Sequence, residues 1–262
     1  MRALVTGGCG FIGSCISKKL VDAGYKKIIV LSGLNNNLRQ QTQIRVDEGL
    51  LAYDTQASSL GTKIYQGPLA ARRMNYKLPI ISCGTNSKLN GDFKKNVADN
   101  LNFHTDDPAI FVVKKNKSVL EKLIGYYLSS PKVHGVTVEQ KPFKVRGHFS
   151  TFPPFIKDKP ILIIDDEVDN GSVDTGEQLV NEEGNFDLDY DPKTINRLIR
   201  TLLNIFDKRV YIGYTATPFA NIFIHNQAKT NEEGLDLFPK DYIIDLPIPS
   251  NHVGLEKIFN TE

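Results

Sequence analysis

Acidic residues follow the most hydrophobic short run of the sequence. Residues 161–164 are all isoleucine or leucine, and they lead into Asp165, Asp166 and Glu167, with Asp169 two positions later. Metal-dependent phosphoryl transfer needs an acid that holds a magnesium ion and a second group that orients or deprotonates the attacking water. A buried strand ending in Asp-Glu supplies both, with Asp166 as the metal-side acid and Glu167 as the base. The alternative is a solvated acidic turn.

A second polar cluster ends a later apolar run. Residues 209–218 read as a strand that finishes in Thr215, Ala216, Thr217 and Pro218. If this strand lies next to the one that ends at the acids, Asp169 can accept a hydrogen bond from the threonines. We therefore expect Asp169, Thr215 and Thr217 to couple the two strand ends.

Short apolar strands alternate with helical patterns along the chain. Alternation of this kind, with continuous apolar strands, indicates an α/β fold with a mostly parallel sheet covered on both faces. Such sheets place ligand chemistry at the carboxyl ends of their strands. Strands are expected at 2–5, 26–34, 78–84, 108–115, 160–167 and 209–218, and helices at 11–25, 36–50, 118–128 and 191–208, the last capped by Asp191.

Composition excludes several classes of protein. The 262 residues carry a net charge of +2, too small to indicate nucleic-acid binding by itself. No apolar run approaches the roughly 20 residues of a membrane span, so we expect no membrane partner and a cytoplasmic location. The three cysteines form no CxxC pair and predict neither a zinc site nor a disulfide framework.

The two polar clusters resemble known motifs. Asp166-Glu167-Val168-Asp169 is similar to the Walker B, or DEAD-type, motif of superfamily II helicases, and Thr215-Ala216-Thr217 is similar to their motif III. The chain also resembles the bacterial Z-one domain family (letter Z, numeral one). Its members join that domain to a helicase-like ATPase core and are often labelled endonucleases of restriction or phage-defence systems. The resemblance is discontinuous between about residues 22 and 259, in segments such as "IFVVKKNKSVLEKL", "ILIIDDEVDN" and "YIGYTATPFANIFI".

This resemblance implies a RecA-like, P-loop-type three-layer lobe with irregular insertions. It implies Mg²⁺ and ATP as cofactors and DNA as partner. By the same analogy, "LSGLNNNLRQQTQIR" would touch a nucleic-acid backbone, with contacts from Asn37, Arg39, Gln41 and Arg45. A plain polar helix face is the alternative for these four residues.

The glycine-rich segment near the N-terminus departs from that family. A phosphate loop reads GxxxxGK[ST], and its lysine reaches the terminal phosphates. Gly8 and Gly13 have the right separation, but Ser14 stands in place of the lysine and Cys15 in place of Ser or Thr. We therefore expect weak or absent ATPase activity from this chain alone.

Another resemblance fits the same segment better. "MRALVTGGCGFIGS" is similar to the nucleotide fingerprint of extended short-chain dehydrogenases and epimerases, with Gly7, Gly10 and Gly13 at the right spacing. It implies a Rossmann-like module that binds NAD or another nucleotide without catalysis. Ser32 stands where an acid for the ribose hydroxyls is expected, and no tyrosine has a lysine four residues later.

The organisation inferred from both resemblances is composite. Residues 1–227 are expected to form the helicase-like lobe, with 1–25 as its dehydrogenase-like strand, loop and helix. Residues 228–262 are expected to begin a following, truncated region. A second motor lobe or companion defence-system subunits would then complete the machine.

Two further patterns are open to more than one interpretation. Glu139 and Lys141 form a loose match to a PD-(D/E)xK nuclease. Lys114, Lys115 and Lys117 follow a predicted strand, where they could meet phosphate or belong to a solvated helix start.

Overall fold

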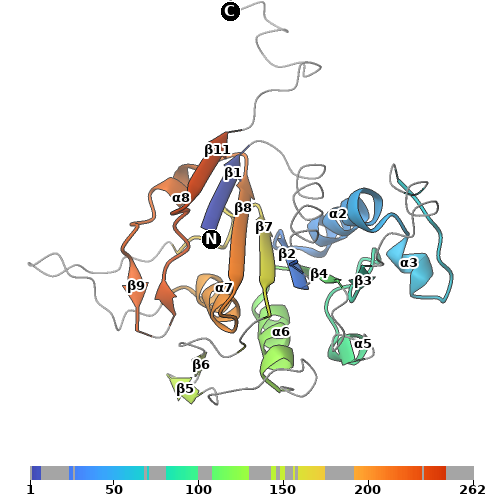
Figure 1. Ribbon diagram of the computed structural model, residues 1–262, viewed down its shortest axis with the longest axis horizontal. Coiled ribbons are helices and arrows are strands. Elements are labelled where there is room, and N and C mark those ends of the chain that lie inside the picture. The colour runs from blue at the N-terminus through green and yellow to red at the C-terminus, as the bar shows by residue number, and fades with distance from the viewer. Residues whose placement is uncertain are drawn as a thin grey trace, which may run out of the picture.

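A parallel sheet of seven strands organises the molecule (Figure 1). The computed structural model describes residues 2–6, 24–25, 27–67, 70, 81–99, 108–129, 143–145, 148–150, 156, 159–174, 192–231 and 233–245. Every strand pair in the large sheet is parallel, which confirms the α/β fold class with its mostly parallel sheet. The strand order is β11 (Tyr242–Asp245), β1 (Arg2–Thr6), β8 (Arg209–Thr215), β7 (Ile161–Asp166), β2 (Lys27–Ser32), β4 (Ala109–Lys114) and β3 (Ser82–Cys83).

Two hydrophobic cores lie on opposite faces of this sheet, because successive side chains of a strand point to opposite sides. Ile161 and Ile163 of β7 belong to the core that includes α6 (Lys117–Ser129) and α7 (Thr194–Asn204). Leu162 and Ile164 belong to the other core, which includes Leu50 and Leu51. These leucines lie in η1 (Asp47–Leu51), a π-helical turn that continues α2 (Asn36–Val46). Both faces of the central strands are therefore buried, as their continuous apolar runs predict.

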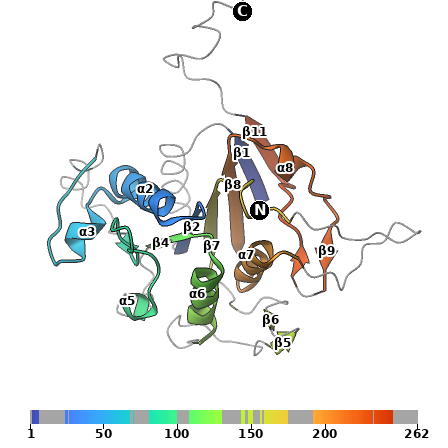
Figure 2. The same ribbon diagram turned by 180° about the vertical axis from the view of Figure 1, so that it is seen from behind.

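The two views of the ribbon show how the helices are distributed. The helices α6 and α7 lie together on one side of the central strands, and α2 lies on the other (Figures 1 and 2). Short elements lie outside these layers: α3 (Thr55–Ser58), α5 (Lys95–Asp99), α8 (Phe219–Ile222), and the two-stranded pair β5 (Phe143–Val145) and β6 (His148–Ser150). Among the described residues, no helix combines the length and the apolar character needed to cross a bilayer.

The start of α7 differs from the sequence expectation. Its N-cap is Lys193, which makes no side-chain capping bond, so the prediction that Asp191 caps this helix is wrong. Several sides of the helix are buried, and the buried side chains include the polar ones of Asn196, Arg200 and Asn204. Such burial holds α7 by tertiary contacts, and those contacts decide where its first turn begins.

Those buried polar groups hold a segment that was expected to lie outside the lobe. Arg200 donates to the hydroxyl of Thr230 and to the carbonyl of Gly234, and Asn204 donates to the carbonyl of Glu233. The acceptors lie in or beside the hairpin of β9 (Lys229–Thr230) and β10 (Gly234–Leu235). Farther along, β11 pairs with β1 in the main sheet. Residues 242–245 therefore belong to the same sheet as β1, across the boundary expected between 227 and 228.

Candidate functional site

The strand that ends in acids and the strand that ends in threonines are neighbours. In the β7–β8 pairing Asp166 lies opposite Tyr214, one residue before Thr215. In the next pairing Thr215 lies opposite Thr6, the last residue of β1. The expectation that the two clusters emerge side by side from adjacent parallel strands is thus confirmed. The chain also leaves β1 for its glycine-rich segment directly beside Thr215.

Asp169 joins the two strand ends through a pair of hydrogen bonds. The hydroxyl of Thr215 donates to Oδ1 at 2.6 Å and the hydroxyl of Thr217 donates to Oδ2 at 2.5 Å. Partial burial by itself would raise the pKa of Asp169, but these two bonds, with the charge of Lys115, bring the pKa below its ordinary value. Asp169 is therefore an ionised acceptor whose lone pairs are engaged by threonines, as the coupling role requires.

Asp165 has a structural role that the sequence did not reveal. It is fully buried, and the ammonium of Lys115 lies 3.0 Å from its Oδ1. The hydroxyl of Tyr211 donates to its other oxygen at 2.7 Å. The interpretation of Lys115 as a phosphate ligand or a solvated lysine is wrong, because its side chain is fully buried in this ion pair. The sequence does contain one indication of this burial. Lys115 is two residues beyond Val113, so the alternation of side chains along an extended strand places both on the same face of the sheet.

The same lysine shapes the turn after β7. Its Nζ also donates to the backbone carbonyls of Asp166 and Glu167, at 2.9 and 2.5 Å. Glu167 adopts a φ of 56°, in the left-handed region that non-glycine residues seldom occupy. Strained backbone of this kind persists only where its surroundings enforce it, and it gathers at functional sites. Here Lys115 and the bond from the amide of Val168 to the carbonyl of Tyr214 enforce it.

The side chain of Glu167 lies over the turn between β2 and α2. A Cβ added at Gly33 would come within 3.0 Å of its Oε2 and within 2.4 Å of a methyl carbon of Leu38. Gly33 is therefore required for the close approach of the two segments. The carboxylate thus projects toward the start of α2, on the β2 side of β7 rather than the β8 side.

Asp166 is the acid best placed to hold a metal. It is half-buried at the strand end, and Thr42 of α2 makes a long hydrogen bond of 3.4 Å to its Oδ2. Magnesium is usually held by one or two protein carboxylates, with water and substrate phosphates completing its shell. Asp166 and Glu167 together make that number of carboxylates. Within the described ranges no group of three or more acidic, histidine or cysteine side chains forms a metal cage.

Other predicted residues lie beyond the described ranges. These are the glycine-rich loop residues Gly7, Gly8, Gly10, Gly13 and Ser14, together with the nuclease candidates Glu139 and Lys141. Thr6, which pairs with Thr215, is the last described residue before this loop.

The predicted nucleic-acid contacts on α2 divide into two groups. Asn37, Gln41 and Arg45 are exposed and recur every fourth residue, so they share one face of the helix. Arg39 is fully buried and donates to the carbonyls of Asn86 and Lys88. Its prediction as a phosphate contact is therefore wrong, since its guanidinium holds the loop after β3 instead.

Comparisons with known proteins add no relative. No family model, no curated protein and no solved structure matches the chain.

Proposed function

We propose that the chain is the nucleotide-binding lobe of a Z-one-type, helicase-like NTPase that acts on DNA in a restriction or phage-defence system. The observation that carries the proposal is the alignment of three strand ends. The strand before the glycine-rich segment, the strand ending in Thr215 and the strand ending in Asp166 are consecutive in the sheet. Parallel sheets bind nucleotides at the carboxyl ends of such strands.

Each acid has its own task in this proposal. Asp166 holds a magnesium ion, which would neutralise charge on the phosphates of ATP. Glu167 orients the attacking water from its fixed position in the strained turn. Asp169 senses movement of β8 through Thr215 and Thr217. In the same proposal the exposed face of α2 lies along the DNA backbone. A second lobe or companion subunits complete the NTPase, which acts in the cytoplasm.

The strand order weighs against the dinucleotide-binding alternative. In a Rossmann fold the glycine-bearing strand lies next to the strand whose end contacts the ribose. Here β8 and β7 separate β1 from β2. Ser32, at the end of β2, is buried and donates to the carbonyl of Val113. Ser32 is therefore not available to bind the hydroxyls of a ribose.

Nucleotide titration tests the proposal. ATP should bind in the presence of magnesium, and Asp166→Asn should weaken that magnesium-dependent binding at least tenfold. Asp207→Asn is the matched control, because Asp207 is an exposed acid next to the opposite end of β8. Metal-independent NAD binding that is lost in Gly10→Val and unaffected by Asp166→Asn would favour the alternative. Robust ATP turnover with DNA would show that the loop needs no lysine.

A further inference from the structure

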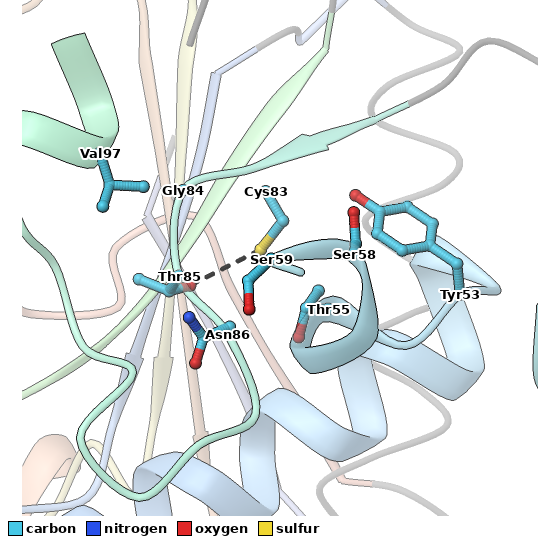
Figure 3. A pocket seen from close by; sticks show the side chains of 9 residues that line it. All are labelled: Tyr53, Thr55, Ser58, Ser59, Cys83, Gly84, Thr85, Asn86 and Val97. Carbon is cyan, nitrogen blue, oxygen red and sulfur yellow. Dashed lines mark hydrogen bonds between the residues drawn. The ribbon is translucent and has the colours of Figure 1, made fainter. Parts of the chain in front are cut away.

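A polar pocket lies beyond the carboxyl end of the edge strand β3, apart from the acidic site. It holds about 220 Å³ and is bounded by α3, α5 and the loop that follows β3 (Figure 3). Val97 and Tyr53 are drawn on opposite sides of it, with the hydroxyl-bearing residues between them. Carboxyl ends of parallel strands are the usual location of ligand sites in such sheets.

The lining of the pocket contains no charged side chain. Its polar groups are hydroxyls and one amide, among them Ser58, Ser59 and Asn86, and Cys83 adds a sulfur. Burial raises the pKa of the Cys83 thiol to about 11, so at neutral pH it too is uncharged. Among the residues that line the pocket, a phosphate or carboxylate ligand would find no cation. The pocket is therefore suited to an uncharged ligand with hydrogen-bonding edges.

Two polar residues that line the pocket, Ser58 and Asn86, have hydrogen-bonding capacity that the fold does not use. Within the described part of the chain, no hydrogen bond engages the hydroxyl of Ser58. The amide oxygen of Asn86 accepts from the backbone N–H of Lys88. Its amide nitrogen is drawn on the side of Thr85 in Figure 3 and has a hydrogen to donate. One hydroxyl and one amide N–H can together bind the edge of a ligand that carries both a hydrogen-bond donor and an acceptor.

The pocket wall is held rigid by a buried hydrogen-bond network. Asp47 accepts from Thr55 Oγ1 at 2.6 Å and from Gln43 Nε2 at 2.8 Å. Gln43 in turn accepts from Thr85 Oγ1 at 2.7 Å. Thr55 and Thr85 line the pocket, and Gln43 belongs to α2. A wall fixed in this way loses little entropy when a ligand binds.

We propose that this pocket binds a single nucleobase, either free or unstacked from a nucleic-acid strand. Its volume lies below the roughly 300–1,000 Å³ of drug-sized ligand sites, which matches a base better than a whole nucleotide. Flipped bases are recognised by hydrogen bonds to their edges and by contact with aromatic or apolar side chains. Ser58 and Asn86 supply the former, and Tyr53 and Val97 supply the latter.

The free-base form of this proposal does not depend on the proposed motor function. The strand form rests on it, because α2 carries the exposed Asn37, Gln41 and Arg45 on one face and anchors the pocket wall through Gln43. Arg39, on the opposite side of the same helix, holds the pocket residue Asn86.

Fluorescence titration with 2-aminopurine riboside, a fluorescent nucleoside, tests the binding of a base that is not part of a strand. The wild-type chain should bind it, and Ser58→Phe, which fills the pocket, should weaken binding at least tenfold. Gln56→Phe is the matched control, because Gln56 is an exposed residue of the same helix and does not line the pocket. If Ser58→Phe does not fold, as judged by circular dichroism, Val97→Phe fills the pocket from the opposite wall.

Single-stranded DNA distinguishes the source of the base. An abasic strand of equal length keeps its phosphates, so any preference for the ordinary strand measures base recognition. Loss of that preference in Ser58→Phe assigns the pocket to strand bases, and its retention alongside loss of riboside binding assigns the pocket to free bases. Riboside binding without any strand binding would overturn the motor proposal and leave the pocket. No riboside binding, together with an unchanged strand preference in both filling variants, would overturn the pocket proposal.

Discussion

Lys115 and Asp165 form a buried ion pair across two strands that are not neighbours. The lysine follows the end of β4, Asp165 lies near the end of β7, and β2 runs between them. The 3.0 Å contact spans the carboxyl edge of the sheet and continues into the turn that carries Glu167. The geometry of the candidate catalytic turn therefore depends on a residue from another part of the sequence.

Removal of this lysine should destabilise the fold strongly. Lys115→Met leaves Asp165 buried without its charge partner, and breaking a buried pair in this way costs about 3–5 kcal/mol. Urea unfolding should show that loss, and the double variant Lys115→Met/Asp165→Asn should recover part of it. Lys117→Met serves as control, because Lys117 is largely exposed and its contact with Glu121 is long. A Lys115→Met variant within about 1 kcal/mol of wild type would contradict the pairing.

Asp169 should make stability depend on pH in the acid range. Its pKa in the folded chain lies below its ordinary value, so its contribution is fully present above about pH 4 and is lost as the pH falls through the folded pKa. The difference in unfolding free energy between wild type and Asp169→Asn should be constant from pH 5 to 8 and shrink below pH 4. Thr217→Val should reduce this pH-dependent part. A difference that stays the same at pH 3 and pH 7 would exclude the two hydroxyl bonds.

Asp47 should act in the opposite direction. Burial raises its pKa to about 6, against the hydrogen bonds from Thr55 and Gln43 that lower it. The folded chain then binds more protons than the unfolded chain between about pH 4 and pH 6, so stability falls as the pH rises through that window. Relative to Asp47→Asn, the wild type should lose on the order of 2–3 kcal/mol across it. Unfolding curves at half-unit pH steps measure this, and a flat difference would refute the shift.

Two arginines of the same helix should give contrasting variants. Arg39→Ala removes buried hydrogen bonds to the loop after β3 and should lower the unfolding free energy by about 2–4 kcal/mol. Arg45→Ala changes an exposed residue and should stay within about 0.5 kcal/mol. If α2 contacts DNA, Arg45→Ala should also weaken single-strand binding and reduce the salt slope by about one.

Binding titrations at several salt concentrations measure this effect. Lys122→Ala, an exposed change on the helix that covers the other face of the sheet, should leave affinity and slope unchanged. Equal effects of Lys122→Ala and Arg45→Ala would indicate diffuse charge attraction instead of a contact along α2.

The sequence by itself predicted most strands of the sheet and the residue types at their ends. The apolar runs before Asp165 and Thr215 predict two buried strands, and these form as β7 and β8. A helix expected over 118–128 appears as α6, which begins one residue earlier and ends one later. These features depend on local periodicity, which a single sequence carries directly.

Only the tertiary structure decided the order of the strands and which charged side chains are buried. That β8 and β7 separate β1 from β2 follows from crossover connections, which local patterns do not encode. Lys115 and Arg39 look like ordinary surface cations in the sequence, yet both are buried against acceptors about 50 positions away. A charge can leave water only where the fold supplies compensating partners, and those partners come together only when distant segments pack.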